Sequence, residues 1–117
     1  MHYILEEIMS NQTCEIRIEL KYNPSISVIS GRPTGLECYM NQMKNIVETN
    51  INTEGIKFII VFPECIKLIS GSCLLGMFEE INNMVGISGI KEKFAFESNT
   101  GDELEKMLLD ELKRSGC

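Results

Sequence analysis

The sequence predicts an α/β protein whose elements follow the order β-β-α-β-α-β-α, with a mixed sheet built on parallel core strands and helices packed against it. Residues 14–21 alternate strictly between apolar and charged side chains, which indicates a strand with one solvated face. Residues 56–62 are apolar except for Lys57, which is typical of a buried strand. Three stretches with helical spacing of apolar residues separate or follow the later strands, so parallel, right-handed crossovers are expected.

The N-terminal third is expected to contain two strands. We predict that residues 1–12 form an N-terminal arm and that residues 14–21 form an edge strand, because alternating charges suit a sheet edge. Residues 25–30 predict a second strand, with Ile26 and Val28 on one face. The turn signal at residues 22–24 makes a β-hairpin the expected pairing of these two strands.

A first helix is expected after residue 34. Thr34 and Glu37 have the spacing of a capping box. The apolar residues that follow recur every three or four positions, and methionine at such positions is typical of core packing. The expected buried stripe comprises Leu36, Tyr39, Met40, Met43, Ile46 and Val47.

The central strand, residues 56–62, is expected to be buried on both faces and to end at Pro63, followed by an irregular return. Ser70 or Ser72 is expected to cap the second helix. Gly86 is expected to end that helix, ahead of a loop at residues 87–90. A third parallel strand is predicted at residues 93–97. A second capping box at residues 100–103 is expected to open the last helix. The expected buried stripe of the second helix comprises Leu74, Leu75, Phe78, Ile81 and Val85. That of the last helix comprises Leu104, Met107, Leu108 and Leu112.

Composition restricts the function classes. The chain has 117 residues, so a single domain spanning 1–117 is expected. A net charge of −6 disfavours nucleic acid and anionic membranes as partners. No apolar stretch is long enough to span a bilayer, and the first residues lack the pattern of a secretory signal. Five cysteines without CxxC spacing argue against a disulfide framework or a metal site and predict reduced thiols in the cytoplasm.

No catalytic constellation is evident, so an enzyme is not predicted and no cofactor is expected. His2 is the only histidine, which disfavours Ser-His-Asp and Cys-His arrangements. Neither a GxGxxG nor a GxxxxGK[ST] phosphate-binding pattern occurs. Adjacent carboxylates such as Glu79 and Glu80 lack the spacing of an acid–base pair and are expected to be solvated.

Two stretches of small residues precede the first two helices. The first contains Gly31, Arg32, Thr34 and Gly35, where an arginine beside a helix start suits an anion or small ligand; a glycine-assisted turn into the helix is the simpler reading. The second is Ser70, Gly71, Ser72 and Cys73. It suits recognition by a partner, an anion, or phosphorylation of Ser70 or Ser72, whereas an ordinary serine N-cap is again the plain alternative.

These stretches resemble a known family. Residues 61–74, VFPECIKLISGSCL, resemble without gaps the STAS-domain segment that leads from the central strand to the second helix. Residues 27–35, SVISGRPTG, are similar to the strand that enters the first helix of that family, most closely in small STAS-like bacterial proteins with a Gly-Arg-x-x-Gly stretch. The resemblance covers about residues 13–114. It implies a non-enzymatic regulatory domain related to the anti-sigma factor antagonists.

The loop departs from the family pattern at its central position. Anti-sigma factor antagonists usually carry Asp-Ser-Ser/Thr-Gly there, and the first serine is phosphorylated by a partner kinase. Ser70 and Gly71 match the aspartate and the phosphorylated serine, and Ser72 and Cys73 match the next two positions. The phosphate acceptor is therefore missing at its own place, although Ser70 or Ser72 could substitute.

The expected function is a cytoplasmic, bacterial or phage protein that docks a protein partner, such as a kinase-like or sensor regulator. The expected contact residues are those at 70–73 together with Glu79 and Asn83 on the second helix. One alternative is small-ligand or nucleotide binding at the helix starts 31–35 and 70–73. Another is a homodimer that pairs the strand of residues 14–21 with its copy.

Overall fold

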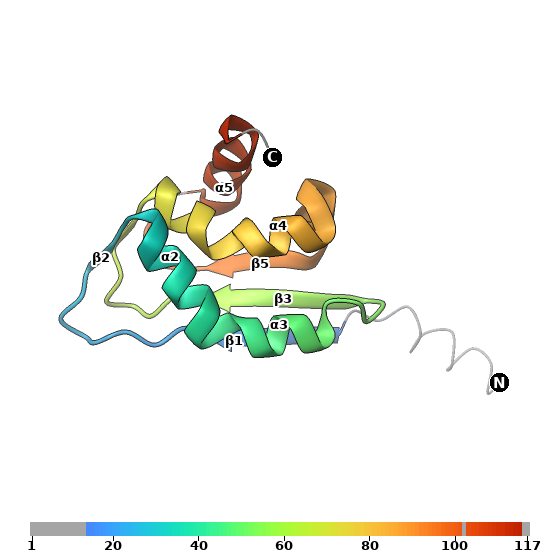
Figure 1. Cartoon of the computed structure of the whole chain (residues 1–117). Helices are drawn as coiled ribbons and strands as arrows, with labels where there is room; N and C mark the ends of the chain where they lie inside the picture. Colours follow the sequence, from blue (N-terminus) through green and yellow to red (C-terminus); the bar gives the residue numbers. More distant parts are fainter. Residues whose placement is uncertain (1–13, 102, 116–117) are drawn as a thin grey trace.

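Residues 14–101 and 103–115 are described by a computed structural model, in which strands alternate with helices (Figure 1). Three strands, β1 (Cys14–Glu19), β3 (Ile56–Val61) and β5 (Phe94–Glu97), form a sheet in the order β1-β3-β5. Both pairings are parallel, with Ile16 beside Phe58 and Phe58 beside Phe94. The predicted α/β class and the parallel core are therefore confirmed.

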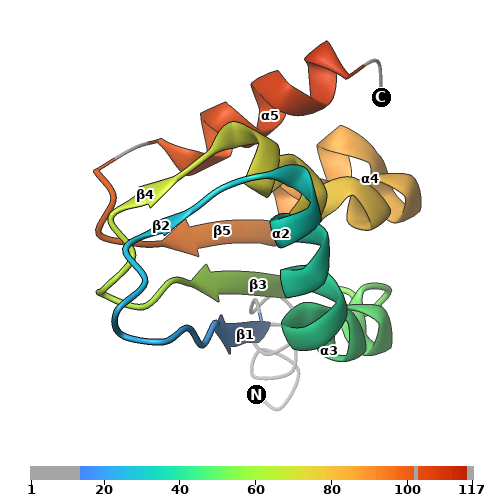
Figure 2. The ribbon, with the colours of Figure 1, turned by 60° about the vertical axis from the view of Figure 1, so that its left-hand side comes forward.

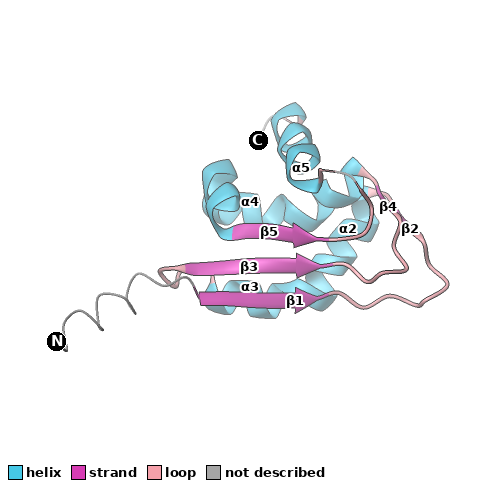
Figure 3. Ribbon diagram, turned by 180° about the vertical axis from the view of Figure 1, so that it is seen from behind, coloured by secondary structure: helices cyan, strands magenta, loops and turns pink. Residues whose placement is uncertain are grey.

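The helices gather on one face of this sheet. The first helical region runs through α2 (Arg32–Cys38), the π-helical turn η1 (Tyr39–Met43) and α3 (Lys44–Asn50). The others are α4 (Gly71–Lys93) and α5 (Leu104–Arg114), which packs beside α4. Figure 3 shows the three strands from behind, with α2, α3 and α4 on their far side. The side chains of one sheet face consequently meet a helical layer, whereas no helix within residues 14–101 and 103–115 covers the other face.

The central strand is buried on one face only. Phe58 and Ile60 are fully buried, whereas Lys57, Ile59 and Val61 on the opposite face are only partly buried. The expectation of burial on both faces was wrong, because the helices pack on a single side. On the opposite face an ion pair spans β3: Arg17 Nη1 lies 2.6 Å from Glu97 Oε2.

The predicted β-hairpin is wrong. Strand β1 pairs with β3, while β2 (Val28–Ile29) pairs in parallel with β4 (Leu68–Ile69) in a separate two-stranded sheet. Among the described residues, then, both sheets are parallel rather than mixed. The segment between β1 and α2 therefore reaches β4 instead of folding back on β1. Val28 is half exposed, whereas its neighbour Ile29 is buried in the core, so β2 is held by Ile29 and by its backbone bonds to β4.

The first helix differs from its prediction in two ways. Its N-cap is Gly31, with φ 92° and no side-chain cap, so Thr34 lies inside the helix and the Thr34–Glu37 capping box is wrong. A π-helical turn also takes more residues per turn than an α-helix, which rotates the buried stripe. Tyr39, Met43 and Val47 are buried as predicted. Leu36, Met40 and Ile46 are instead 40%, 46% and 37% exposed.

The later helices confirm part of their predictions. Gly86 interrupts α4 with φ 73° and ψ 177°, which agrees with its predicted helix-ending role, but residues 87–93 are helical rather than a loop. The second capping box is wrong, because α5 has Glu103 as its N-cap and no side-chain cap. Leu104, Leu108 and Leu112 are buried as expected. The predicted arm at residues 1–12 lies outside the described residues.

Candidate functional site

The two helix starts singled out from the sequence lie side by side. The parallel β2–β4 pair immediately precedes α2 and α4, so it delivers both helices to the same place (Figure 2). The amide of Gly31 donates to the Ser70 hydroxyl oxygen at 3.2 Å, across 39 positions in the sequence. The structure therefore joins the 31–35 and 70–73 stretches into one surface region.

Glycines allow α2 and α4 to cross in direct backbone contact. A Cβ atom placed on Gly35 would lie 1.9 Å from the carbonyl oxygen of Cys73. One placed on Gly76 would lie 2.0 Å from the carbonyl oxygen of Arg32. Both distances are impossible for non-bonded atoms, so the crossing requires glycine on each helix. Gly35 was considered from the sequence as part of a glycine-assisted turn or of a ligand site, and the role of Gly76 in helix packing was missed. Their spatial pairing leaves no local sequence signal.

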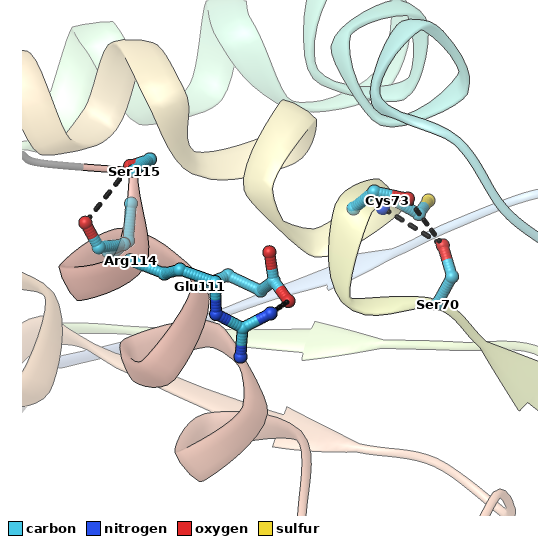
Figure 4. Close-up of polar contacts among 7 residues, drawn as sticks. Ser70, Cys73, Glu111, Arg114 and Ser115 are labelled. Carbon is cyan, nitrogen blue, oxygen red and sulfur yellow. Dashed lines mark hydrogen bonds and ion pairs between the residues drawn. The ribbon is translucent and has the colours of Figure 1, made fainter.

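Ser70 caps α4. Its hydroxyl oxygen accepts from the amide of Cys73 at 3.0 Å (Figure 4). The same oxygen lies 3.1 Å from the hydroxyl of Ser72. The Cys73 side chain is fully buried, and burial raises the pKa of its thiol to about 12. Cys73 is thus neither a reactive thiol nor a residue that a partner could touch, because it packs in the core. Of the four predicted loop residues, Ser72 is exposed, and Ser70 and Gly71 are partly buried.

The last helix, α5, places a carboxylate against the N-terminal end of α4. A Cβ atom on Gly71 would lie 2.7 Å from Glu111 Oε2, so this carboxylate packs directly on the first residue of α4. Arg114 Nη1 lies 3.1 Å from the same oxygen (Figure 4). A negative charge at a helix N-terminus is favourable. Glu111 therefore occupies the region where an external anion would bind, and sequence reasoning missed it.

Removing the Ser70 side chain gives a direct test of the N-cap of α4. We expect Ser70→Ala to lower the free energy of unfolding by about 1–2 kcal/mol, because two backbone amides lose their acceptor. Urea denaturation followed by circular dichroism measures the loss. Ser72→Ala is the matched control, and its exposed side chain should change the stability by no more than about 0.5 kcal/mol. Equal losses in the two variants would contradict the assigned cap.

Arg32 and Glu79 link the two helices at the surface. The guanidinium Nε donates to Glu79 Oε1 at 2.8 Å, and a second bond joins Nη2 to Oε2. The hydrogen bonds from Arg32 lower the pKa of the Glu79 carboxyl, with the positive charge acting in the same direction and partial burial opposing them. The predicted anion-binding arginine is therefore already engaged by a carboxylate of this chain.

A groove lies between α2 and α4, beside this ion pair. Its volume is about 390 Å³, and its lining residues are Leu36, Met40, Glu79, Glu80 and Asn83. Two of these, Glu79 and Asn83, were predicted from the sequence as partner contacts. Leu36 and Met40 were assigned to the core instead, because the π-helical turn that exposes them has no clear sequence signal. One exposed apolar wall thus faces an acidic and polar wall.

Tests for other site types were negative within the described part of the chain. No three His, Cys, Asp or Glu side chains among these residues group closely enough to hold a metal ion. The helices described here include none that is both long and apolar enough to cross a membrane. Comparisons with protein-family models, with curated proteins and with solved structures found no match to this chain.

Proposed function

We propose that this protein is a non-enzymatic, STAS-like regulatory module of the cytoplasm that binds a partner protein through the α2–α4 surface. This surface comprises the groove, the exposed residue Ser72 and the outer face of α4 around Asn83. The observation that carries the proposal is the groove itself, because its exposed apolar wall lies beside the contact residues expected from the sequence. The α/β class and the parallel sheet are compatible with a STAS-like domain.

Some of the exposed apolar residues lie at or near this groove, while others, such as Val28 and Leu68, lie on the β2–β4 pair. Leu36 on α2 and Met40 on η1 lie four positions apart, and Met84, which is 42% exposed, lies one turn after Glu80 on α4. Clustered apolar side chains rimmed by polar ones are typical of protein interaction sites. Methionine suits such a surface because its flexible thioether adapts to different partner shapes. The surface therefore fits protein docking better than it fits chemistry on a small substrate.

The backbone beneath the groove is held in place before any partner arrives. Gly35 and Gly76 fix the distance between the two helices, and the Arg32–Glu79 pair ties them at the rim. A preformed surface loses little conformational entropy on binding, which favours affinity. The proposed mechanism is occupancy, in which docking withholds or releases a kinase-like or sensor partner.

The alternative of anion or nucleotide binding at the helix starts has less support. Ser70 accepts from backbone amides of this chain, Arg32 is paired with Glu79, and Glu111 places a negative charge on the start of α4. Phosphorylation of Ser70 or Ser72 and a homodimer through the strand of residues 14–21 stay predictions.

Site-specific photocrosslinking tests the proposal. A photoreactive amino acid at Asn83, in cells that naturally make the protein, is expected to give a specific crosslinked species. The same group at Lys113, an exposed position on α5, serves as the control. The Asn83 product should disappear when Leu36 and Met40 are both replaced by serine, because the apolar wall is lost while the fold is retained.

Two outcomes would reject the docking surface. Crosslinks that survive the double serine substitution would show that the groove is not the contact. Products that form equally from Asn83 and Lys113 would show non-specific encounter. A crosslinked product of twice the chain mass that contains only copies of this protein would favour the homodimer instead. Circular dichroism of the double variant checks that its fold is unchanged.

A further inference from the structure

We infer that the partner segment bound in the groove carries a lysine or arginine side chain that pairs with Glu80, next to an apolar side chain that packs on Leu36 and Met40. This inference rests on the proposed function, since it names the chemistry of the partner for the same surface. It commits to a basic, amphipathic peptide segment as the occupant.

The first argument is the uncompensated charge in the groove. The five lining residues include two carboxylates and no cationic side chain. Arg32, beside the groove, engages Glu79 with two hydrogen bonds. Glu80 differs: its Oε2 is buried and has no hydrogen-bond partner among the described residues. No ion pair joins Glu80 to a described cation, and Glu80 lines the groove, so a cationic group of the occupant can compensate its charge from the groove side.

The second argument is the negative potential beneath the groove. The buried phenol of Tyr39 donates to Glu48 Oε2 at 3.2 Å. Burial raises the pKa of Tyr39 most, followed by the charge and hydrogen bond of Glu48, and the charge of Glu80 adds to the effect. Glu80 and Glu48 therefore both act on the same interior group. Together with the net charge of −6, this arrangement attracts a cation and repels an anion.

The third argument is the separation of apolar and acidic walls. Leu36 and Met40 share one face of the first helical region, while Glu79, Glu80 and Asn83 belong to α4. An occupant that satisfies both walls must present an apolar group on one side and a positive group on the other. An amphipathic helix in an apolar groove is a common recognition mode of this kind. A purely apolar segment would leave the charge of Glu80 uncompensated, and a purely basic one would leave Leu36 and Met40 in water.

This chemistry can be tested without a known partner. Peptides that bind the immobilised full chain are selected from a display library of short random peptides. Enriched peptides are expected to combine a lysine or arginine with apolar residues at helical spacing. Binding is mapped by carbon-13 methyl NMR of the methionines, where the signals of Met40 and Met84 should shift. Glu80→Gln should weaken binding by about tenfold, because one charged hydrogen bond is lost.

A matched charge variant separates the specific pair from general attraction. Glu105→Gln removes the same charge from an exposed position on α5 and should leave the peptide affinity nearly unchanged. Two results would overturn the inference and leave the docking surface intact. The first is a peptide that shifts the Met40 methyl signal but lacks a basic residue. The second is a peptide that binds the Glu80→Gln variant as tightly as it binds the natural chain. Failure to enrich any peptide that shifts Met40 or Met84 would count against both.

Discussion

Replacing Gly35 or Gly76 with alanine is expected to destabilise the protein by at least about 3 kcal/mol, near the upper end of overpacking costs. Alanine normally stabilises a helix relative to glycine by up to about 1 kcal/mol, so helix propensity predicts the opposite sign. The backbone contacts of 1.9 Å and 2.0 Å decide the outcome, because a carbonyl oxygen in a helix cannot move aside as a flexible side chain can. Thermal unfolding should show a melting temperature lowered by more than about 10 °C.

The control for this prediction is Thr34→Ala, an exposed position that is adjacent to Gly35 in α2. We expect a change of no more than about 0.5 kcal/mol there. If Gly35→Ala and Gly76→Ala unfold at the same temperature as Thr34→Ala, the close crossing of the two helices is wrong, and with it the geometry of the groove.

Phe78→Ala is expected to have the largest effect among the core substitutions, with a loss of about 3–5 kcal/mol. Phe78 is fully buried where α4 packs on the sheet. Its ring meets Phe94 edge-on at a centroid distance of 5.2 Å and Phe96 at 5.6 Å. Removing the ring forfeits both aromatic contacts and leaves a cavity between the helical layer and β5. Guanidinium denaturation measures the loss.

Ile59→Ala provides the comparison for Phe78, because Ile59 is an apolar residue of β3 that is only partly buried and lies on the face that no described helix covers. Its loss of stability should be clearly smaller, since less apolar area leaves the interior. A cost for Ile59→Ala equal to that of Phe78→Ala would mean that the opposite face of the sheet is covered and that the layer arrangement is incorrect.

Local patterns predicted the elements that depend on their own residues. The alternation at residues 14–21 and the apolar run at residues 56–62 both correspond to strands. Ser70 caps the helix as expected, because an N-cap needs only a serine next to the first turn. Glu79 and Asn83 were predicted to lie on the exposed face of the second helix, and both line the groove, whereas their contact with a partner stays a prediction.

Long-range pairing accounts for the error in the strand arrangement. The hairpin expected between residues 14–21 and 25–30 did not form, because these strands pair with parallel partners distant in sequence, β3 and β4. Leu36 and Met40 were placed in the core by a regular helical period, and one π-helical turn moved them to the surface. The apolar wall of the candidate site was therefore not predictable from spacing alone.

The amino-acid sequence alone determined the α/β class and the alternation of strands and helices, because hydrophobic periodicity and turn residues act over a few neighbouring positions. It also located the two helix starts that later prove to be adjacent. Only the tertiary structure decided that β2 and β4 bring them together, that Gly35 and Gly76 allow the helices to touch, and that Glu80 borders an apolar groove. The physical reason is that each of these features depends on contacts between residues about forty positions apart, which no local pattern records.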